Sequence, residues 1–224
     1  MTEAREDARQ QLVRTAAGMA AAGLAPGTSG NLSVRCDGGF WITPTGLAAG
    51  ALAAEDLCLV RGDGSWDGPY APSSEWRLHR DLYSARSGVR AVLHAHPPFA
   101  VSLACLRRDI PAFHYMIARF GGDSVRCSRY ATFGTQELSD AALEALAGRN
   151  ACLLANHGVL VCAPDLEEAL ALGVELEELC GQYWRACLLG HPVLLSFEEM
   201  AVVLDKFTRY GRPVSREGVV ISDG

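Results

Sequence analysis

Two histidines separated by one alanine, at the end of an apolar run, constrain this 224-residue chain more than any other feature. The run from Ala91 to His96 predicts a β-strand, and Pro97 ends it. Because side chains alternate along a strand, His94 and His96 lie on the same face. Two imidazoles side by side at a strand end are able to bind one cation, although a His-x-His pair alone is more often packed or hydrogen-bonded than ligating.

Two other segments supply the groups that a metal site would need. The segment 72–75 predicts the start of a helix, with Glu75 in its first turn. His157 follows another apolar run, and it adds a third imidazole. Three neutral imidazoles and one carboxylate form a ligand set of zinc type. Glu75 fits that set, and it fits equally well as an ordinary first-turn residue, because carboxylates are favourable near a helix N-terminus.

Composition limits the class of protein. Hydrophobic residues make up 49% of the chain, which is enough for one large core, so we expect one domain. The net charge is −6 without a basic cluster, which argues against nucleic acid as a partner. The N-terminus carries charges of both signs, and the uncharged stretch 15–34 is broken by Pro26. We therefore expect neither a signal peptide nor a membrane partner.

The cysteines indicate a reducing environment. The chain has eight of them, and no two form a Cys-x-x-Cys pair. Most lie within apolar runs, which is typical of reduced core cysteines. We therefore expect a cytoplasmic protein.

Three segments rich in small residues have the character of anion-binding loops. These are 27–31, 43–46 and 72–74. Consecutive backbone N–H groups in such loops suit a phosphate, and so do the free N–H groups at the start of a helix that Ser73 would cap. Ordinary turns and plain N-capping by Ser73 explain the same segments.

Periodicity and capping signals predict an alternation of helices and strands. Helices are expected over residues 3–23, from Ser73 to about Tyr83, and over 99–106, 139–148, 165–189 and 197–210. Strands are expected over 32–35, 40–42, 57–60, 91–96, 151–155 and 159–162. The expected fold class is α/β: a single domain over residues 1–224, with a central sheet flanked by helices on both faces and a loose C-terminal tail from about residue 211.

Five motifs occur in the order and approximate spacing of one known family. They are Gly30-Asn31, Thr45-Gly46, Ser73-Ser74-Glu75, His94-Ala95-His96-Pro97 and His157-Gly158. On these motifs, the chain resembles the class II aldolase/adducin family from about Leu12 to Gly211. Within the family, the segments 114–118, 130–135 and 206–211 are most similar to the L-fuculose-1-phosphate aldolases.

The resemblance implies a metal-dependent lyase that assembles as a homotetramer with sites at subunit interfaces. The implied cofactor is zinc, with cobalt or manganese as alternatives. The residues that match the metal ligands are Glu75, His94, His96 and His157. Those that match the phosphate-binding residues are Gly30, Asn31, Thr45, Gly46, Ser73 and Ser74. Tyr115, Phe133 and Tyr210 match residues that a neighbouring subunit contributes.

The chemistry of an aldol cleavage agrees with a metal site. Breaking a carbon–carbon bond beside a ketone leaves a carbanion, which either a lysine Schiff base or a metal ion must stabilise. The sequence contains one lysine, Lys206, without an evident acid–base partner, so the metal route is favoured. We then expect Glu75 to carry the proton of the carbanionic carbon and Tyr115 that of the aldehyde oxygen, with Tyr210 as a further catalytic residue.

The same family contains other activities. A pentulose-phosphate 4-epimerase and a methylthioribulose-phosphate dehydratase keep a similar metal set, whereas the segments around Tyr115 and Tyr210 favour cleavage. A non-catalytic scaffold such as the adducin head domain predicts missing ligands, and all four are present in this chain.

The expected substrate is a small phosphorylated ketose. Phe133, Phe207 and Tyr210 would form an apolar pocket for a deoxy or thioether terminus. Fuculose 1-phosphate, 5-deoxyribulose 1-phosphate and 5-methylthioribulose 1-phosphate all fit that description. Arg119 is bulky and charged where the resemblance leads us to expect small residues.

Overall fold

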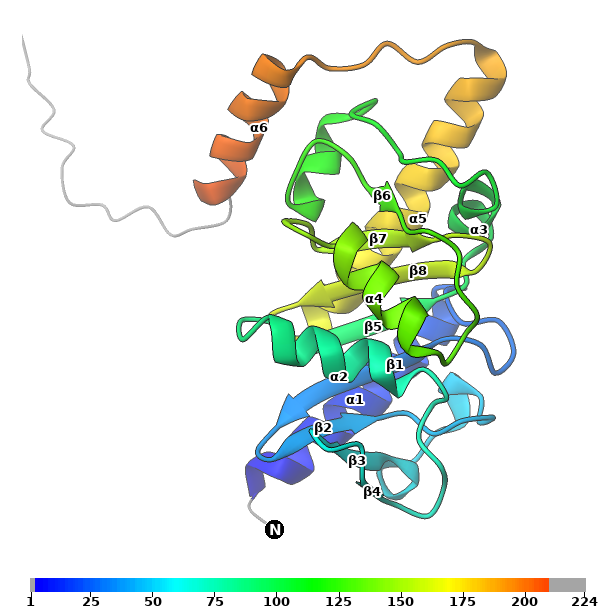
Figure 1. Ribbon diagram of the computed structural model, residues 1–224, viewed down its shortest axis with the longest axis vertical. Coiled ribbons are helices and arrows are strands. Elements are labelled where there is room, and N and C mark those ends of the chain that lie inside the picture. Colours follow the sequence, from blue (N-terminus) through cyan, green and yellow to red (C-terminus); the bar gives the residue numbers. More distant parts are fainter. Residues whose placement is uncertain (1–2, 210–224) are drawn as a thin grey trace, which may run out of the picture.

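An eight-stranded sheet runs through the protein in the order β4-β3-β2-β1-β5-β8-β7-β6 (Figure 1). The structure, a computed structural model, describes residues 3–209. The strands are β1 (Asn31–Cys36), β2 (Gly39–Ile42), β3 (Cys58–Arg61), β4 (Trp66–Asp67), β5 (Ala91–Ala95), β6 (Arg126–Cys127), β7 (Ala151–Leu154) and β8 (Gly158–Ala163). Neighbouring strands are antiparallel, except that β6 and β7 are parallel.

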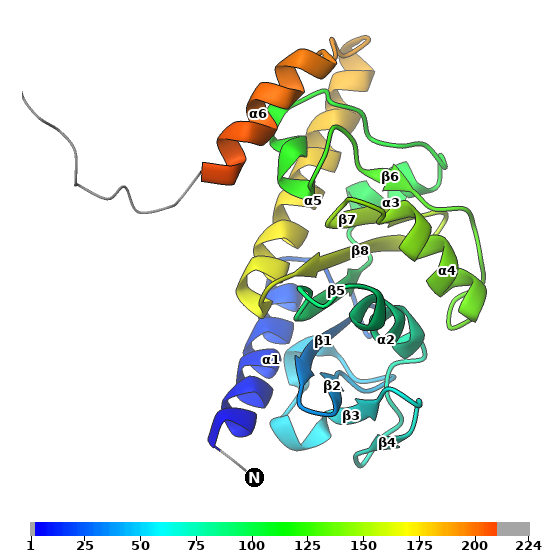
Figure 2. The same ribbon diagram turned by 60° about the vertical axis from the view of Figure 1, so that its left-hand side comes forward.

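Helices cover both faces of this sheet, as Figure 2 shows. They are α1 (Glu3–Ala21), α2 (Trp76–Ala85), α3 (Pro98–Ala104), α4 (Gln136–Ala145), α5 (Leu166–Leu189) and α6 (Phe197–Arg209), with short 3-10 helices η1 (Ala49–Ala51), η2 (Ala54–Asp56) and η3 (Tyr115–Phe120). Helices α1, α3 and α5 pack on one face, and α2 and α4 on the other. The predicted fold class is confirmed.

The core is divided by the sheet into two clusters, because successive side chains of a strand point to opposite faces. Along β5, Leu93 packs on the α1–α5 side and Val92 on the α2–α4 side. His94, two residues after Val92, therefore faces α2. Helix α1 contributes Leu12 and Met19 to the first cluster, and both are fully buried. The apolar packing thus fixes which face of the sheet carries the histidine.

The start of α2 differs from the prediction. Ser73 was expected to be the N-cap, but the helix begins at Trp76 and Glu75 occupies the capping position without a side-chain cap. Ser73 instead closes a tight turn, in which its Oγ accepts a hydrogen bond from the Glu75 backbone N–H at 3.3 Å. The turn places Glu75 ahead of the helix, with its carboxylate directed toward the sheet.

Two other helix starts test the capping signals. The predicted start of a helix at Ser139 is wrong, because α4 begins at Gln136 and Thr135 Oγ1 accepts from the backbone N–H of Leu138 at 3.3 Å. At the predicted start of α5, Asp165 is the N-cap, and its Oδ1 accepts from the backbone N–H of Glu168 at 2.8 Å. The capping group is therefore a hydroxyl at α4 and a carboxylate at α5.

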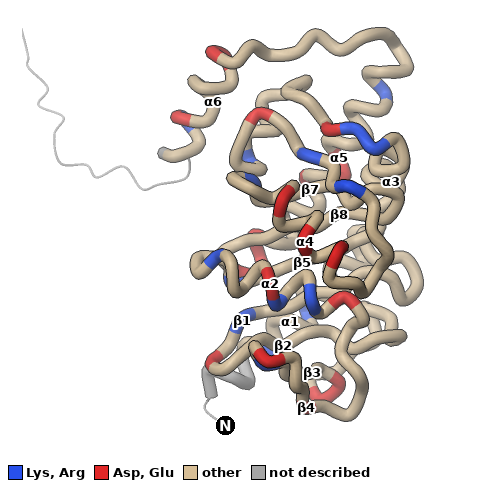
Figure 3. Tube along the Cα trace, in the orientation of Figure 1, with Lys and Arg blue, Asp and Glu red and all other residues tan. Residues whose placement is uncertain are grey.

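Charged residues lie mainly on the helices and loops around the sheet, with acidic and basic residues interspersed (Figure 3). Within residues 3–209, no helix combines the length and the apolar character that crossing a bilayer requires. Tyr210 and the tail expected from about residue 211 lie outside the described residues.

Candidate active site

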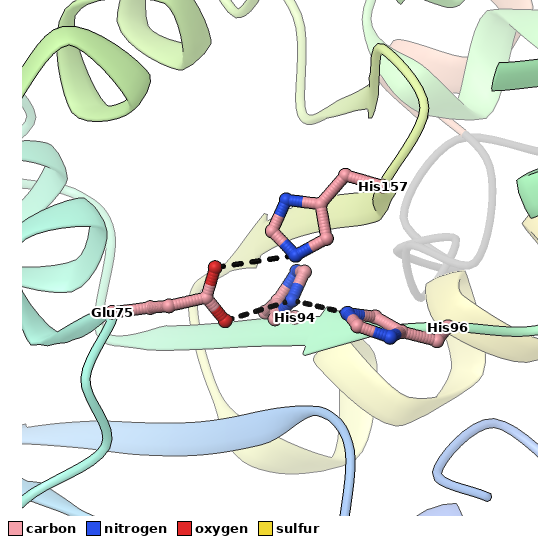
Figure 4. A group of neighbouring side chains, drawn as sticks. All are labelled: Glu75, His94, His96 and His157. Carbon is pink, nitrogen blue, oxygen red and sulfur yellow. Dashed lines mark hydrogen bonds and ion pairs between the residues drawn. The ribbon is translucent and has the colours of Figure 1, made fainter. Parts of the chain in front are cut away.

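Four side chains from three distant segments converge beside the end of β5 (Figure 4). His94 lies on β5, and His96 follows that strand directly. His157 belongs to the turn between β7 and β8, and Glu75 precedes α2. The four residues predicted as metal ligands are therefore brought together by the fold.

The carboxylate of Glu75 lies between two of the histidines. Its Oε2 is 3.0 Å from His94 Nε2, and its Oε1 is 3.3 Å from His157 Nε2. Nε2 of His96 is 2.9 Å from Nε2 of His94. One ligand atom from each of the four residues lies within 4.8 Å of the others. Four donor atoms at such separations surround one point, as the coordination of a single cation requires.

Strand pairing orients His94. Its Nδ1 lies 2.8 Å from the carbonyl oxygen of Val159, the residue paired with Ala95 across β5 and β8. The carbonyl can only accept, so Nδ1 carries a proton, and Nε2 is the nitrogen that faces the other ligands. A backbone partner of this kind fixes both the tautomer and the ring plane of a metal-binding histidine.

The turn that carries His157 has little freedom. Asn156 has a positive φ of 54°, and its Oδ1 accepts a hydrogen bond from Arg107 Nε at 2.6 Å. At Gly158, a Cβ atom would lie 2.8 Å from Cδ2 of His96, closer than real side chains approach. Glycine at this position therefore lets the rings of His96 and His157 sit edge to face, with centroids 4.9 Å apart.

Burial and mutual charge set the protonation of the cluster. Burial alone would raise the pKa of the Glu75 carboxyl, but the charge and hydrogen bond of His94, with smaller contributions from His157 and His96, together outweigh it, and the pKa falls to about 2. For His94, burial is outweighed by Glu75, so its pKa is raised. Burial, together with the charge of His94, lowers the pKa of His96 and of His157 to about 4. His96 and His157 are thus neutral at pH 7, the form in which imidazole binds a metal.

The arrangement fits a divalent metal ion. Among the described residues, Oε1 of Glu75 is a buried oxygen without a hydrogen-bond partner, which is costly in a folded protein. A cation between this oxygen and the nearby Nε2 of His157 would supply the missing partner. Three imidazoles and one carboxylate are also a donor set that suits zinc-like cations. Glu75, His94, His96 and His157 are therefore the residues that could hold the metal.

A pocket of about 320 Å³ opens over this cluster. Glu75, His96 and His157 lie on its wall, and His94 is buried behind them. The other predicted site residues on the wall are Gly30, Asn31, Thr45, Gly46, Ser73, Ser74 and Phe133. The loops that the sequence marked as anion-binding therefore border the same cavity as the ligand cluster. Such a cavity is within the size range of small-ligand sites.

The aromatic residues predicted for the site do not lie together. Phe133 was matched to a residue that a neighbouring subunit contributes, but its side chain lines the pocket of its own chain and is 66% exposed. Tyr115 is absent from that wall and lies on η3, on the wall of a separate cavity beside α6. Tyr210 lies outside the described residues.

Arg119 also lies outside the pocket of the ligand cluster. Its guanidinium is 2.9 Å from a carboxylate oxygen of Glu168 and 3.8 Å from one of Glu175, both on α5. These ion pairs attach η3 to the long helix. The unexpected charge at this position therefore has partners within its own chain.

Sequence reasoning missed a row of buried polar residues behind Glu75. It comprises Ser33 on β1 with His79 and Tyr83 on α2, in addition to Asn31. One signal was available, because His79 and Tyr83 follow Glu75 at intervals of four residues and so share one face of the helix. The alternation of polar and apolar residues in β1 gave no such signal, because it is also the usual pattern of an antiparallel strand with one face in solvent.

Comparison with known proteins agrees with this geometry. A family model described as "Class II Aldolase and Adducin N-terminal domain" matches residues 10–184. A 5-methylthioribulose-1-phosphate/5-deoxyribulose-1-phosphate aldolase of Rhodospirillum rubrum is 50% identical over 203 residues, covering 91% of this chain and 92% of the relative. An L-fuculose phosphate aldolase of Escherichia coli is 44% identical, covering 90% and 94%. A solved structure of L-fuculose 1-phosphate aldolase superimposes with a TM-score of 0.87 at 40% identity, covering 90% and 96%.

Proposed function

The chain belongs to the class II aldolase and adducin family, and on that premise we propose that it reversibly cleaves a ketose 1-phosphate to dihydroxyacetone phosphate and an aldehyde. The observation that carries the proposal is the complete cluster of one glutamate and three histidines on the wall of a pocket bordered by small-residue loops. The relatives named above act on phosphorylated ketoses of this type.

The proposed metal is zinc, held by Glu75, His94, His96 and His157, with cobalt or manganese as possible substitutes. When bound, such an ion supplies Lewis-acid stabilisation of the negative charge that develops on the substrate oxygens. The protein itself keeps two histidines neutral and holds the His94 ring by its backbone partner. The site is thereby ready to bind a cation without rearranging His94.

The phosphate group is assigned to the small-residue wall of the pocket. Gly30 and Gly46 have positive φ values of 80° and 77°, conformations that glycine adopts readily. They lie beside Thr45, Ser73 and Ser74, whose hydroxyl groups are neutral donors. No lysine or arginine is found on the described wall. The phosphate would therefore be held by hydrogen bonds and would orient the ketose toward Glu75.

The proton steps fall to two residues. Glu75 is a buried carboxylate on the pocket wall, so it is the candidate that removes and returns the proton of the carbanionic carbon. Tyr115 is assigned the proton of the aldehyde oxygen, and Tyr210 assists it. Because Tyr115 lines a separate cavity in its own chain, this role requires a neighbouring subunit, and we propose a homotetramer with sites between subunits. The eight cysteines include no Cys-x-x-Cys pair and lie mostly within apolar runs, which supports a cytoplasmic location.

The substrate is tested by steady-state kinetics of the zinc-loaded protein on three ketose phosphates. Fuculose 1-phosphate, 5-deoxyribulose 1-phosphate and 5-methylthioribulose 1-phosphate share the phosphate end and differ at the aldehyde end. We expect cleavage with release of dihydroxyacetone phosphate, measured with a coupled dehydrogenase. The aromatic ring of Phe133 on the pocket wall suits the apolar end that all three substrates carry, so their relative kcat/KM values identify the preferred one. Turnover of these substrates without release of dihydroxyacetone phosphate would exclude the aldolase and favour an epimerase or a dehydratase.

Tyr115→Phe tests the second proton carrier. The variant is expected to lose aldol cleavage by roughly 10²-fold or more, the usual contribution of one general acid–base group. Solvent exchange of the methylene proton of dihydroxyacetone phosphate is expected to survive, because that step involves no aldehyde and therefore no proton transfer at the aldehyde oxygen. Equal loss of both activities would show that Tyr115 has a different role.

Subunit mixing tests the origin of Tyr115. Tyr115→Phe and Glu75→Gln chains are each expected to be inactive in cleavage, and hybrid oligomers are expected to regain part of it. In a hybrid, one interface pairs an intact Glu75 with an intact Tyr115. If confirmed hybrids show no recovery, each site is built from a single chain and the proposed assembly is wrong.

A further inference from the structure

A continuous row of buried polar groups leads from Glu75 into the space between α2 and β1. Nδ2 of Asn31 lies 3.1 Å from Oε2 of Glu75. Oδ1 of Asn31 lies 2.5 Å from Nε2 of His79, and Nδ1 of His79 lies 2.6 Å from Oγ of Ser33. Oγ of Ser33 is also 2.7 Å from the hydroxyl of Tyr83. None of these residues belongs to the set that the sequence assigned to metal binding or proton transfer, apart from Glu75 itself.

The direction of each hydrogen bond follows from the end that faces the site. An ionised carboxylate only accepts, so Asn31 must turn its NH2 group toward Glu75 and its oxygen toward His79. His79 must then donate from Nε2 and accept at Nδ1, as a neutral imidazole does in one tautomer. Ser33 donates its hydroxyl proton to Nδ1, and the hydroxyl of Tyr83 is left to donate to Ser33.

Packing excludes water from the inner part of the row, behind Asn31, which itself lies on the pocket wall. His79 and Ser33 have no exposed surface, and Asn31 and Tyr83 are each 5% exposed. The ring of Phe40 lies alongside His79, with centroids 6.4 Å apart, and also contacts Tyr83. A buried polar group without a partner is unfavourable, so each member depends on the next one for its orientation. The row therefore has one arrangement that satisfies every donor and acceptor.

We propose that His79 is a positioning residue of the active site, which holds the Asn31 amide with its NH2 group on Glu75 and so fixes the Glu75 carboxylate beside the three histidines. Ser33 and Tyr83 hold His79 in the Nε2-protonated tautomer that this requires. His79 does not line the pocket, and it acts only through Asn31. The inference deepens the proposed function, on which its catalytic part rests, because Glu75 is both a metal ligand and the proton carrier there.

The tautomer gives a direct spectroscopic test. In protein labelled with 15N-histidine, long-range 1H–15N correlation spectra distinguish a ring protonated at Nε2 from one protonated at Nδ1. His79, identified by the signal lost in His79→Phe, is expected to be protonated at Nε2, with and without zinc. In the zinc-loaded protein, His94 is expected to be protonated at Nδ1 because of its bond to Val159. Protonation of His79 at Nδ1 would overturn the proposal, since Asn31 would then present its oxygen to Glu75.

Two substitutions of His79 test its effect on the site. His79→Phe keeps a ring beside Phe40 and removes the donor to Asn31, whereas His79→Gln keeps a donor near the same place. His79→Phe is expected to weaken zinc binding by ~10- to 100-fold, the usual effect of disturbing a hydrogen bond to a metal ligand. His79→Gln is expected to recover most of this loss. Zinc affinity is measured by competition with a chromophoric chelator, and His191→Phe, at an exposed position, is the matched control.

The outcomes separate this inference from the proposed function. Unchanged zinc affinity in folded His79→Phe would overturn the positioning role. Equal weakening in both His79 variants would also overturn it, because the loss would then not depend on the donor. Neither readout requires turnover, so a wild-type protein that binds zinc but cleaves no ketose phosphate would refute the proposed reaction alone. If His79→Phe does not fold, the tautomer decides the question, with the His79 signal assigned as the one lost in His79→Gln.

Discussion

Glu75→Gln is expected to slow the exchange of the methylene proton of dihydroxyacetone phosphate with solvent by roughly 10²- to 10⁴-fold, and to slow aldol cleavage with it. The substitution keeps the size and shape of the side chain, and its carbonyl oxygen still accepts from Asn31 Nδ2. What is lost is the ionised oxygen that removes the proton. Exchange is measured by 1H NMR in D2O, at zinc concentrations that saturate the variant.

The matched control for this variant is Glu178→Gln. Glu178 is an exposed residue of α5 and undergoes the same change of charge away from the site. It should retain both exchange and cleavage. Exchange at the wild-type rate in a zinc-loaded Glu75→Gln protein would remove Glu75 from its role as proton carrier, while leaving its role as a ligand open to separate measurement.

Removal of the metal is expected to abolish cleavage. Treatment with a chelator should leave no measurable release of dihydroxyacetone phosphate, and added zinc should restore it. His157→Ala removes one of the four donors and leaves Oε1 of Glu75 without its neighbour at 3.3 Å. This variant should therefore bind zinc weakly or not at all, as shown by its metal content after gel filtration.

His191→Ala is the control for the loss of a histidine, because His191 is exposed and distant in sequence from the ligands. It should keep its zinc and its activity. Full activity of a preparation from which metal has been removed to below detection would contradict the proposed mechanism, whatever the metal content of the His157→Ala variant.

The metal cluster could be anticipated from sequence because its determinants are local. A strand of alternating side chains places His94 and His96 on one face whatever the strand pairs with. The positions of Glu75 and His157 beside them depend on the chain order of the sheet, in which β5 lies between β1 and β8. No spacing rule yields that order. The inclusion of Glu75 and His157 in the ligand set came from the family resemblance, and the fold brings both beside His94.

The buried row behind Glu75 could not be anticipated in the same way. In β1, Leu32 and Val34 alternate with Asn31 and Ser33, a pattern typical of a strand with one face in water. The polar face is instead covered by α2, and Ser33 has no exposed surface. Polar residues on both elements make this burial possible, since each satisfies a partner on the other. Periodicity records which residues share a face, but not what lies opposite.

Helix boundaries failed where local and tertiary interactions compete. The signal at Ser73 was that of an N-cap, yet the chain makes a turn at Ser73, the helix begins at Trp76, and Glu75 occupies the capping position. Here the contacts of the Glu75 side chain with the histidines replace the most favourable local N-cap. The assignment of Tyr115 to a neighbouring subunit depends on contacts between chains, which neither the sequence pattern nor one chain contains.

The position of β5 in the sheet has a consequence for how the site can diverge. His94 lies on a strand that is hydrogen-bonded on both sides, to β1 and to β8, so its backbone tolerates little change. The segments that border the pocket around Gly46 and Phe133 are irregular connections outside the strands. Insertions and substitutions there leave the sheet intact. Substrate preference can therefore change between relatives through these connections, while the arrangement of the metal ligands stays the same.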